Sequence, residues 1–141
     1  MDLPNLLIKN LLSGGNIFYF TSNKILSNEP HNFVLLKNHN KLLYFSCCTK
    51  QYDTIQKYII KSKNDENTLA SLDYNKYDFL KFPTFINCNN YTLYTELEFV
   101  NLYNNSKIKF KGVLDIAEFE LIKKGLLLSN DIEQEIKDLF L

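Results

Sequence analysis

Histidine and cysteine are the side chains in this sequence best suited to acid–base or nucleophilic chemistry, and both are scarce. The 141 residues contain two histidines, His31 and His39, and three cysteines, Cys47, Cys48 and Cys88. A histidine can act as acid or base near neutral pH, whereas a cysteine nucleophile needs a nearby histidine and a lowered thiol pKa. Cys48 with His31 would therefore define a small-molecule enzyme. The alternative is that all three cysteines are reduced thiols packed as small apolar residues.

The spacing of these residues does not indicate a metal site. Cys47 and Cys48 are adjacent in an expected strand, where neighbouring side chains point to opposite faces. No pair of C-x-x-C spacings is present, so a structural zinc site is not expected. His31 opens an apolar strand and is either a partly buried, hydrogen-bonded histidine or a functional one. His39 lies between two asparagines and is expected to be a solvated turn residue.

Lysine supplies all the positive charge of the chain. All 16 basic residues are lysines, balanced by 16 acidic residues, so a bidentate guanidinium clamp on phosphate or carboxylate is excluded. The charge is uneven: residues 37–63 carry six lysines against one aspartate, whereas residues 115–138 carry seven acids against three lysines. Aromatic residues among the lysines of 37–63 suit base stacking on a single strand, or else belong to the core: Tyr44, Phe45, Tyr52 and Tyr58.

A second group of lysines lies near the C-terminus. Residues 107–111 (KIKFK) alternate strictly, so a strand here would project three lysines from one face and turn Ile108 and Phe110 inward. The lysine face is either a solvated sheet edge that discourages aggregation or a phosphate-binding surface.

The rest of the chain must position these side chains. A hydrophobic content of 45% and an aromatic content of 14% indicate one globular domain over residues 1–141. Strands are predicted over residues 16–21, 32–37, 41–48, 69–72, 82–87 and 107–111. Residues 38–40 are expected to form a hairpin connection, and the ambiguous segment 96–102 is assigned to a strand.

Three helices complete the expected fold. The first covers residues 4–12 and is closed by two glycines. The second begins at Asp115, with Glu118 three residues later as in a capping box, and stops at Gly125 after two lysines. The last is capped by Ser129 or Asn130 and carries Ile132, Ile136, Leu139 and Phe140. The predicted class is α+β, a small curled antiparallel sheet or barrel covered at one end by C-terminal helices.

The sequence gives no indication of membrane insertion or export. No apolar run approaches the ~20 residues of a membrane-spanning helix, and the first residues lack the basic region of a signal peptide. A soluble protein that stays in the cytoplasm is therefore expected.

Several segments, in order, resemble PemK/MazF-like proteins. Residues 15–20 (GNIFYF) and 30–36 (PHNFVLL) are similar to the first strand, G-x-I-x-x-F, and the second strand, P-H-x-F-V-V-L, of that family. Residues 45–51 (FSCCTKQ) resemble its third strand, which ends in Thr or Ser beside the active site. Residues 85–89 (FINCN) resemble a later strand that often reads S-F-[IV]-D-C. The resemblance covers about residues 14–90.

This resemblance implies an SH3-like β-barrel with appended helices, usually a homodimer. The best-known members are toxins of toxin–antitoxin pairs that cut single-stranded RNA without a metal or cofactor. In that chemistry a ribose 2′-hydroxyl attacks the adjacent phosphate and leaves a cyclic phosphate. The site supplies a base for the hydroxyl, an acid for the leaving oxygen, and a cation or hydrogen-bond donors for the phosphorane.

The resemblance also implies which residues form the site. The best-known members pair an arginine near the second strand with the Thr or Ser, and here Pro30 and His31 stand at the corresponding place. Lysine-based sites occur on this barrel in related toxins. The predicted catalytic residues are therefore His31, Thr49 and Lys50.

The predicted RNA-binding residues are Gln51, next to the catalytic pair, and the lysine face Lys107, Lys109 and Lys111. The expected partners are single-stranded RNA, an antitoxin protein and a second copy of the chain. The alternative function is a non-catalytic barrel of the same fold that binds a partner protein or nucleic acid.

Overall fold

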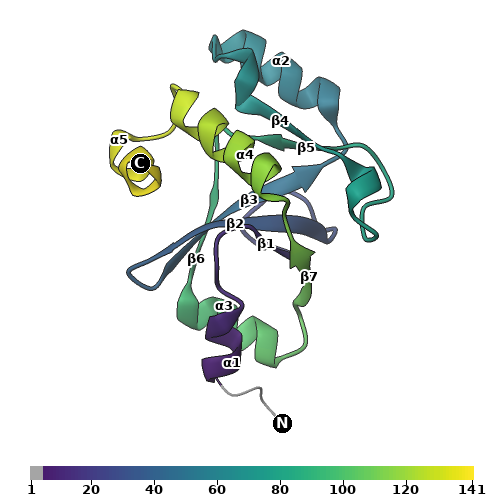
Figure 1. Ribbon diagram of the computed structural model, residues 1–141, viewed down its shortest axis with the longest axis vertical. Helices are drawn as coiled ribbons and strands as arrows, with labels where there is room; N and C mark the ends of the chain where they lie inside the picture. The colour runs from purple at the N-terminus through teal and green to yellow at the C-terminus, as the bar shows by residue number, and fades with distance from the viewer. Residues whose placement is uncertain (1–4) are drawn as a thin grey trace.

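The computed structural model describes residues 5–141, an α+β arrangement of strands and helices as the sequence predicts (Figure 1). The strands are β1 (Asn16–Phe20), β2 (His31–His39), β3 (Leu42–Thr49), β4 (Leu69–Leu72), β5 (Thr84–Asn87), β6 (Thr92–Thr95) and β7 (Lys109–Val113). The helices are α1 (Asn5–Asn10), α2 (Tyr52–Ser62), α3 (Glu96–Asn104), α4 (Ile116–Leu128) and α5 (Gln134–Lys137). Short 3-10 turns are η1 (Glu66–Thr68), η2 (Tyr74–Lys76) and η3 (Asp138–Phe140).

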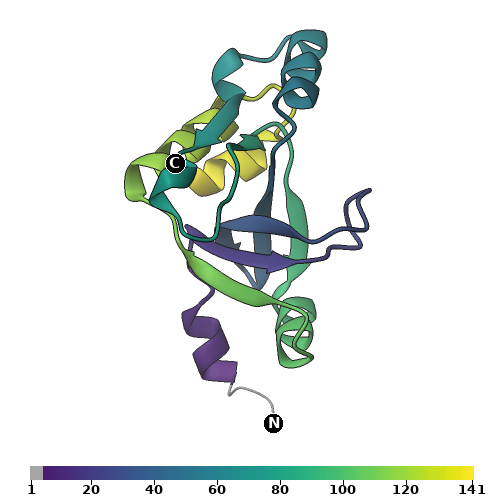
Figure 2. The same cartoon turned by 90° about the vertical axis from the view of Figure 1, so that its right-hand side faces the viewer.

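All seven strands join one antiparallel sheet in the order β4-β5-β3-β2-β1-β7, with β6 attached to β3. The sheet branches at β3, because residues 42–45 pair with β6 and residues 48–49 pair with β5. Helices α2, α4 and α5 lie at the end of the molecule that holds β4 and β5, and α1 and α3 lie at the opposite end (Figures 1 and 2). Within residues 5–141 the sheet is not closed, so the expected SH3-like barrel is not confirmed.

Two irregularities curl this open sheet. The pairing of β2 with β3 shifts register between Leu35 and Lys37, and that of β1 with β7 shifts between Ile17 and Phe18. The second shift lies opposite Gly112, whose φ of +151° is rarely adopted by residues with a side chain. Bulges of this kind bend a strand and increase its twist. Phe110, expected to face inward, is consequently 36% exposed, whereas Ile108 is buried as expected.

Alternation along the central strands divides the core into two clusters. On one face, Ile17 and Val34 pack with α4 through Ile122 and Leu126. On the other face, an aromatic cluster formed by Phe18, Phe20, Phe33, Phe45 and Phe99 packs α3 against the sheet. The rings of Phe45 and Phe99 stack with centroids 5.3 Å apart. Aromatic pairs of this geometry stabilise beyond their area burial.

The assignment of residues 96–102 to a strand is wrong, because this segment is helix α3. Thr95 and Glu98 form a capping box: the Glu98 N–H donates to Thr95 Oγ1 (3.1 Å), and the Thr95 N–H donates to Glu98 Oε1 (2.8 Å). The T-x-x-E spacing that signals such a start is present in the sequence. The actual strand β6 is the four residues before it.

Gly125 does not end the helix predicted from Asp115, since α4 runs on to Leu128. A Cβ atom at Gly125 would lie 2.8 Å from the Asn67 carbonyl oxygen and 2.9 Å from Cys88 Sγ. The glycine therefore lets the helix approach neighbouring backbone closely, a tertiary requirement invisible in the local pattern. The start at Asp115 is confirmed, because its Oδ1 accepts from the Ala117 N–H (2.7 Å).

Two smaller expectations need correction, and one segment without a predicted element forms a helix. The polar segment after β3 forms helix α2, which buries Ile55 and Ile59 one turn apart. The last helix, α5, begins after Glu133 rather than at Ser129 or Asn130. The β2–β3 connection is the two residues Asn40 and Lys41, with φ of +51° and +62°, instead of residues 38–40.

Candidate functional site

A cavity of about 490 Å³ lies where β2 begins and β3 ends, and four predicted site residues line it. They are His31, Thr49, Lys50 and Gln51. The antiparallel pairing of β2 and β3 explains their proximity. Phe33 lies opposite Cys47, and continuing this register sets His31 across from Thr49.

His31 is half-buried at the first position of β2, and its ring contacts Phe33 edge-on at 6.4 Å between centroids. Its Nδ1 lies 3.0 Å from the Glu29 backbone oxygen. A carbonyl oxygen only accepts hydrogen bonds, so Nδ1 must carry the hydrogen and donate it. In the neutral imidazole Nε2 then keeps the lone pair, which makes Nε2 the basic nitrogen.

Thr49 and Gln51 form a turn between β3 and α2. The Gln51 N–H donates to Thr49 Oγ1 (3.1 Å), the local side chain-to-backbone bond typical of Ser and Thr. This contact uses one lone pair of the hydroxyl and leaves its hydrogen free to donate to a ligand. Gln51 precedes the first turn of α2 and is exposed.

Lys50 supplies the cation of the site. Its Nζ lies 5.1 Å from the centroid of the Phe82 ring, within the range of a cation–π contact. The ion pairs of the described residues join Lys9, Lys24, Lys76 and Lys123 to carboxylates. Within residues 5–141, therefore, Lys50 has no carboxylate partner and its charge is available to an anion.

Further residues of the cavity come from segments that the sequence patterns did not point to. Residues 79–82 and Thr84 also line the cavity. Residues 79–81 lie between two predicted strands, whereas Phe82 and Thr84 belong to the strand predicted over residues 82–87. The remaining lining residues outside the predicted set are Tyr19, Ser27, Glu29, Pro30, Asn32 and Cys48. Proximity in sequence to a charged or aromatic cluster is the one signal that could have indicated Lys81 and Phe82.

A long-range anchor holds the 79–82 wall in place. The Tyr77 hydroxyl donates to Glu118 Oε1 of α4 and accepts from the Asp115 N–H (3.0 Å). The Asp73 N–H donates to Glu118 Oε2 (2.7 Å). Burial, and then the hydrogen bond to Glu118, raises the pKa of Tyr77 above its ordinary value. Glu118 thus fixes the connection to α4 instead of completing a capping box.

The predicted lysine face is only partly brought to the cavity. Lys109 pairs across the sheet with Tyr19, a lining residue. Lys111 Nζ lies 5.6 Å from the centroid of the same Tyr19 ring. Lys107 is exposed, precedes β7 and does not line the cavity.

The cysteines are packed thiols rather than nucleophiles. Burial raises the pKa of the Cys47 and Cys88 thiols to about 12. Burial, followed by the adjacent Cys47, raises the pKa of Cys48 further above its ordinary value. All three are free thiols and stay protonated at neutral pH, although Cys48 forms part of the cavity wall next to His31.

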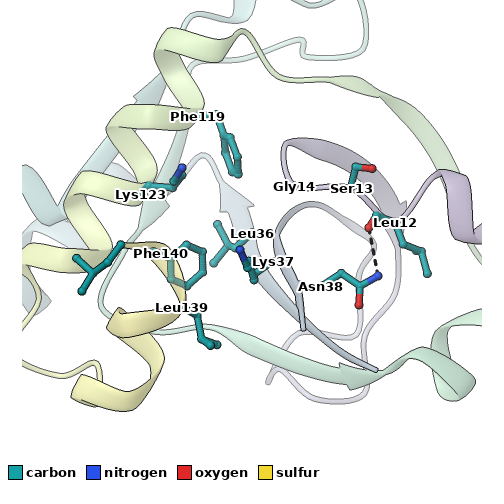
Figure 3. A pocket seen from close by; sticks show the side chains of 11 residues that line it. Leu12, Ser13, Gly14, Leu36, Lys37, Asn38, Phe119, Lys123, Leu139 and Phe140 are labelled. Atoms are coloured by element: carbon teal, nitrogen blue, oxygen red, sulfur yellow. Dashed lines mark hydrogen bonds between the residues drawn. The ribbon is translucent and has the colours of Figure 1, made fainter. Parts of the chain in front are cut away.

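A second cavity, of about 400 Å³, lies between β2, α4 and the C-terminal residues (Figure 3). Its walls combine apolar side chains, among them Leu36, Phe119 and Phe140, with polar groups that include Lys37 and Lys123. Lys123 is paired with Glu120 at 3.2 Å. This cavity contains none of the predicted site residues.

Two features of the described residues bear on wider function classes. Residues 5–141 contain no group of three or more His, Cys, Asp or Glu side chains placed to hold a metal ion. Among the same residues, no helix has the length and apolar character needed to cross a membrane.

Comparison with protein-family models gives no match, and comparison with curated proteins gives none.

Proposed function

We propose that this protein is a toxin-type endoribonuclease that cuts single-stranded RNA without a metal at the cavity formed by His31, Thr49 and Lys50. The observation that carries the proposal is the meeting of an imidazole, a hydroxyl and an unpaired ammonium group in one open cavity. The three groups lie within residues 14–90, the part of the chain that resembles PemK/MazF-like toxins. In this proposal the curled sheet is an open variant of their SH3-like barrel.

The reaction needs one proton acceptor, and His31 Nε2 has the free lone pair for it. As the ribose 2′-oxygen attacks the adjacent phosphorus, Nε2 takes the 2′-hydroxyl proton. The bond from phosphorus to the 5′-oxygen breaks, and the 5′-oxygen takes a proton from water in the open cavity. The products are a 2′,3′-cyclic phosphate and a 5′-hydroxyl, and the imidazolium returns its proton to the resulting hydroxide.

Lys50 and Thr49 act on the charge that develops at phosphorus. The Lys50 ammonium faces the negative phosphorane oxygens, and the Thr49 hydroxyl donates a hydrogen bond to one of them. Lysine binds phosphate as a point charge rather than as a planar fork. Lys81, another lining residue, adds a second positive charge to the same cavity.

The partners follow from the proposed class. A toxin of this kind acts in the cytoplasm, forms a homodimer and is inhibited by an antitoxin protein. Apolar residues exposed on α4, namely Ile116, Leu121 and Leu128, support a protein-binding surface on that helix.

Substitution of the three residues tests the proposal. His31→Ala should lower the cleavage rate of single-stranded RNA by about 10²–10⁴-fold, and Lys50→Ala or Thr49→Ala by about 10²–10³-fold. His39→Ala and Lys57→Ala are matched controls, because both residues are outside the cavity. Cleavage that survives all three site substitutions, or expression that is harmless to cells, would contradict the proposal.

A non-catalytic RNA-binding protein is the second candidate, favoured by the single imidazole of the cavity and the absence of arginine. It predicts RNA binding without cleavage, unchanged by His31→Ala. Binding and cleavage measured on the same preparation distinguish the two functions.

A further inference from the structure

Two lysine–aromatic pairs border the candidate cavity. Lys50 Nζ lies 5.1 Å from the ring centroid of Phe82, and Lys111 Nζ lies 5.6 Å from that of Tyr19. Both aromatic residues line the cavity. Neither lysine is in an ion pair within residues 5–141, so each pair combines an aromatic ring with an ammonium group that has no carboxylate bound to it.

The two aromatic rings belong to segments on opposite sides of the strands that carry His31 and Thr49. Tyr19 belongs to β1, and Phe82 comes two residues before β5. In the sheet order β5-β3-β2-β1, the hairpin of β2 and β3 lies between them. The open end of that hairpin carries His31 and Thr49, so a chain crossing the cavity from one pair to the other passes both residues.

Phe82 is held in an exposed position by its surroundings. Its side chain is 57% exposed, whereas Leu80, two residues earlier, is buried. The Thr84 hydroxyl donates to the Phe82 carbonyl (2.9 Å), and Lys81 Nζ donates to the Asp78 carbonyl (2.8 Å). With the Tyr77 anchor to α4, these bonds order the backbone that presents the ring before any ligand binds.

We propose that the Lys50–Phe82 and Lys111–Tyr19 pairs are two nucleotide subsites for single-stranded nucleic acid, each stacking one base on its ring and pairing one phosphate with its lysine. The identity of the strand as RNA rests on the proposed function, but the binding mode does not require cleavage. Unpaired bases have free π-faces for such stacking. Bases inside a duplex are already stacked on their neighbours, so single strands are selected.

Tryptophan fluorescence tests the Phe82 subsite directly, because the chain contains no tryptophan. Phe82→Trp introduces a single indole, whose emission should fall when a base stacks on it. The probe is a short single-stranded oligoribonucleotide with 2′-O-methyl riboses, which cannot form the cyclic phosphate. Leu97→Trp is the matched control, since Leu97 is 70% exposed on α3 and does not line the cavity.

Affinity for the same labelled oligonucleotide gives the second readout. Phe82→Ala should weaken binding by roughly 5- to 100-fold, the fold-change equivalent of losing one stacked base, whereas Phe82→Tyr should restore it. Lys50→Ala and Lys111→Ala should each lower the slope of log affinity against log salt by about one. Loss of binding with an unchanged slope would overturn the phosphate assignment.

The outcomes separate this inference from the proposed function. Quenching of the indole in the Phe82→Trp variant, without cleavage of unmodified RNA, supports the subsites and rejects the ribonuclease. The subsites alone are overturned if the protein cleaves RNA, the indole of Phe82→Trp is not quenched, and Phe82→Ala binds the oligonucleotide with full affinity. Equal quenching by polyglutamate would also overturn them, because the surface would then recognise charge rather than bases. Failure to bind any nucleic acid overturns both.

Discussion

At the scale of single residues, the contact of His31 with the backbone determines which ring nitrogen carries the hydrogen. The Glu29 carbonyl, 3.0 Å from Nδ1, selects the tautomer with a free Nε2. An imidazole held this way presents its basic nitrogen in a fixed direction without help from a carboxylate. The role proposed for it therefore depends on a backbone contact that side-chain substitution elsewhere leaves intact.

The cysteines should be inert in the folded protein. Because burial raises their pKa values to about 12 or above, the thiolate needed for alkylation is nearly absent at neutral pH. Iodoacetamide should leave native protein unmodified and RNA cleavage unchanged, as mass spectrometry and an activity assay would show. Inactivation by alkylation that Cys48→Ala prevents would instead establish the cysteine enzyme.

Asp115 should give a pH-dependent contribution to stability. Its hydrogen bond from the Ala117 N–H, followed by the contact with Lys76, holds the pKa of Asp115 below its ordinary value. A carboxyl with a lowered folded pKa stabilises the fold above its unfolded pKa of about 3.9, and that contribution is lost as the pH falls further. Asp115→Asn keeps a capping side chain and removes the charge.

Urea unfolding of wild type and Asp115→Asn at several pH values measures this effect. The wild type should be the more stable at neutral pH, and the difference should disappear as the pH falls through the folded pKa of Asp115. A difference that persists unchanged in strong acid would show that the charge is not its origin.

At the scale of elements, the fit of α4 against the sheet depends on Gly125. Gly125→Ala places a methyl group 2.8 Å from the Asn67 carbonyl oxygen, and overpacking of this kind typically costs about 1–3 kcal/mol. The gain in helix propensity, about 1 kcal/mol, offsets part of that cost. Urea unfolding should therefore show a net loss of stability.

Glu120→Ala, at an exposed position of the same helix, is the control for this prediction. It should change the free energy of unfolding by less than about 0.5 kcal/mol. A more stable Gly125→Ala variant would mean that α4 can move away from Asn67 and Cys88 without cost.

The elements also show which local patterns suffice. The strands predicted over 16–21, 32–37, 41–48 and 69–72 are present, because alternation and β-branched or aromatic composition follow directly from a half-buried sheet. The strand expected over 96–102 is predicted wrongly because Phe99 and Val100, which are adjacent and buried, do not distinguish the period of a strand from that of a helix. The signal that indicates a helix is the capping pair Thr95 and Glu98.

The candidate site is predictable to a similar extent. Four predicted site residues meet because β2 begins where β3 ends in one hairpin: His31 is the first residue of β2, Thr49 is the last of β3, and Lys50 and Gln51 follow it. Lys81 and Phe82 line the same cavity, and the segment before them is held to α4 by the Tyr77–Glu118 contact, which spans 41 residues. A contact of that range leaves no local periodicity, so the sequence indicates Lys81 only as part of a connection and Phe82 only as the start of a predicted strand.

At the scale of the whole molecule, the lysines of residues 37–63 do not form one surface. They are distributed over the β2–β3 hairpin, the candidate cavity and α2. The charge that matters for binding is therefore local: Lys50, Lys81 and Lys111 gather around one cavity from three separate segments. A neutral molecule can bind a polyanion at such a place while repelling it weakly elsewhere.

The chemistry of the cut ends tests the central claim most directly. Single-stranded RNA incubated with the purified protein in excess EDTA should yield fragments ending in 2′,3′-cyclic phosphate and 5′-hydroxyl, and His31→Ala should abolish them. The same sequence with 2′-O-methyl riboses should be bound but left intact. Absence of cleavage in EDTA, or cleavage of the 2′-O-methyl strand, would contradict attack by the 2′-hydroxyl and with it the proposed function.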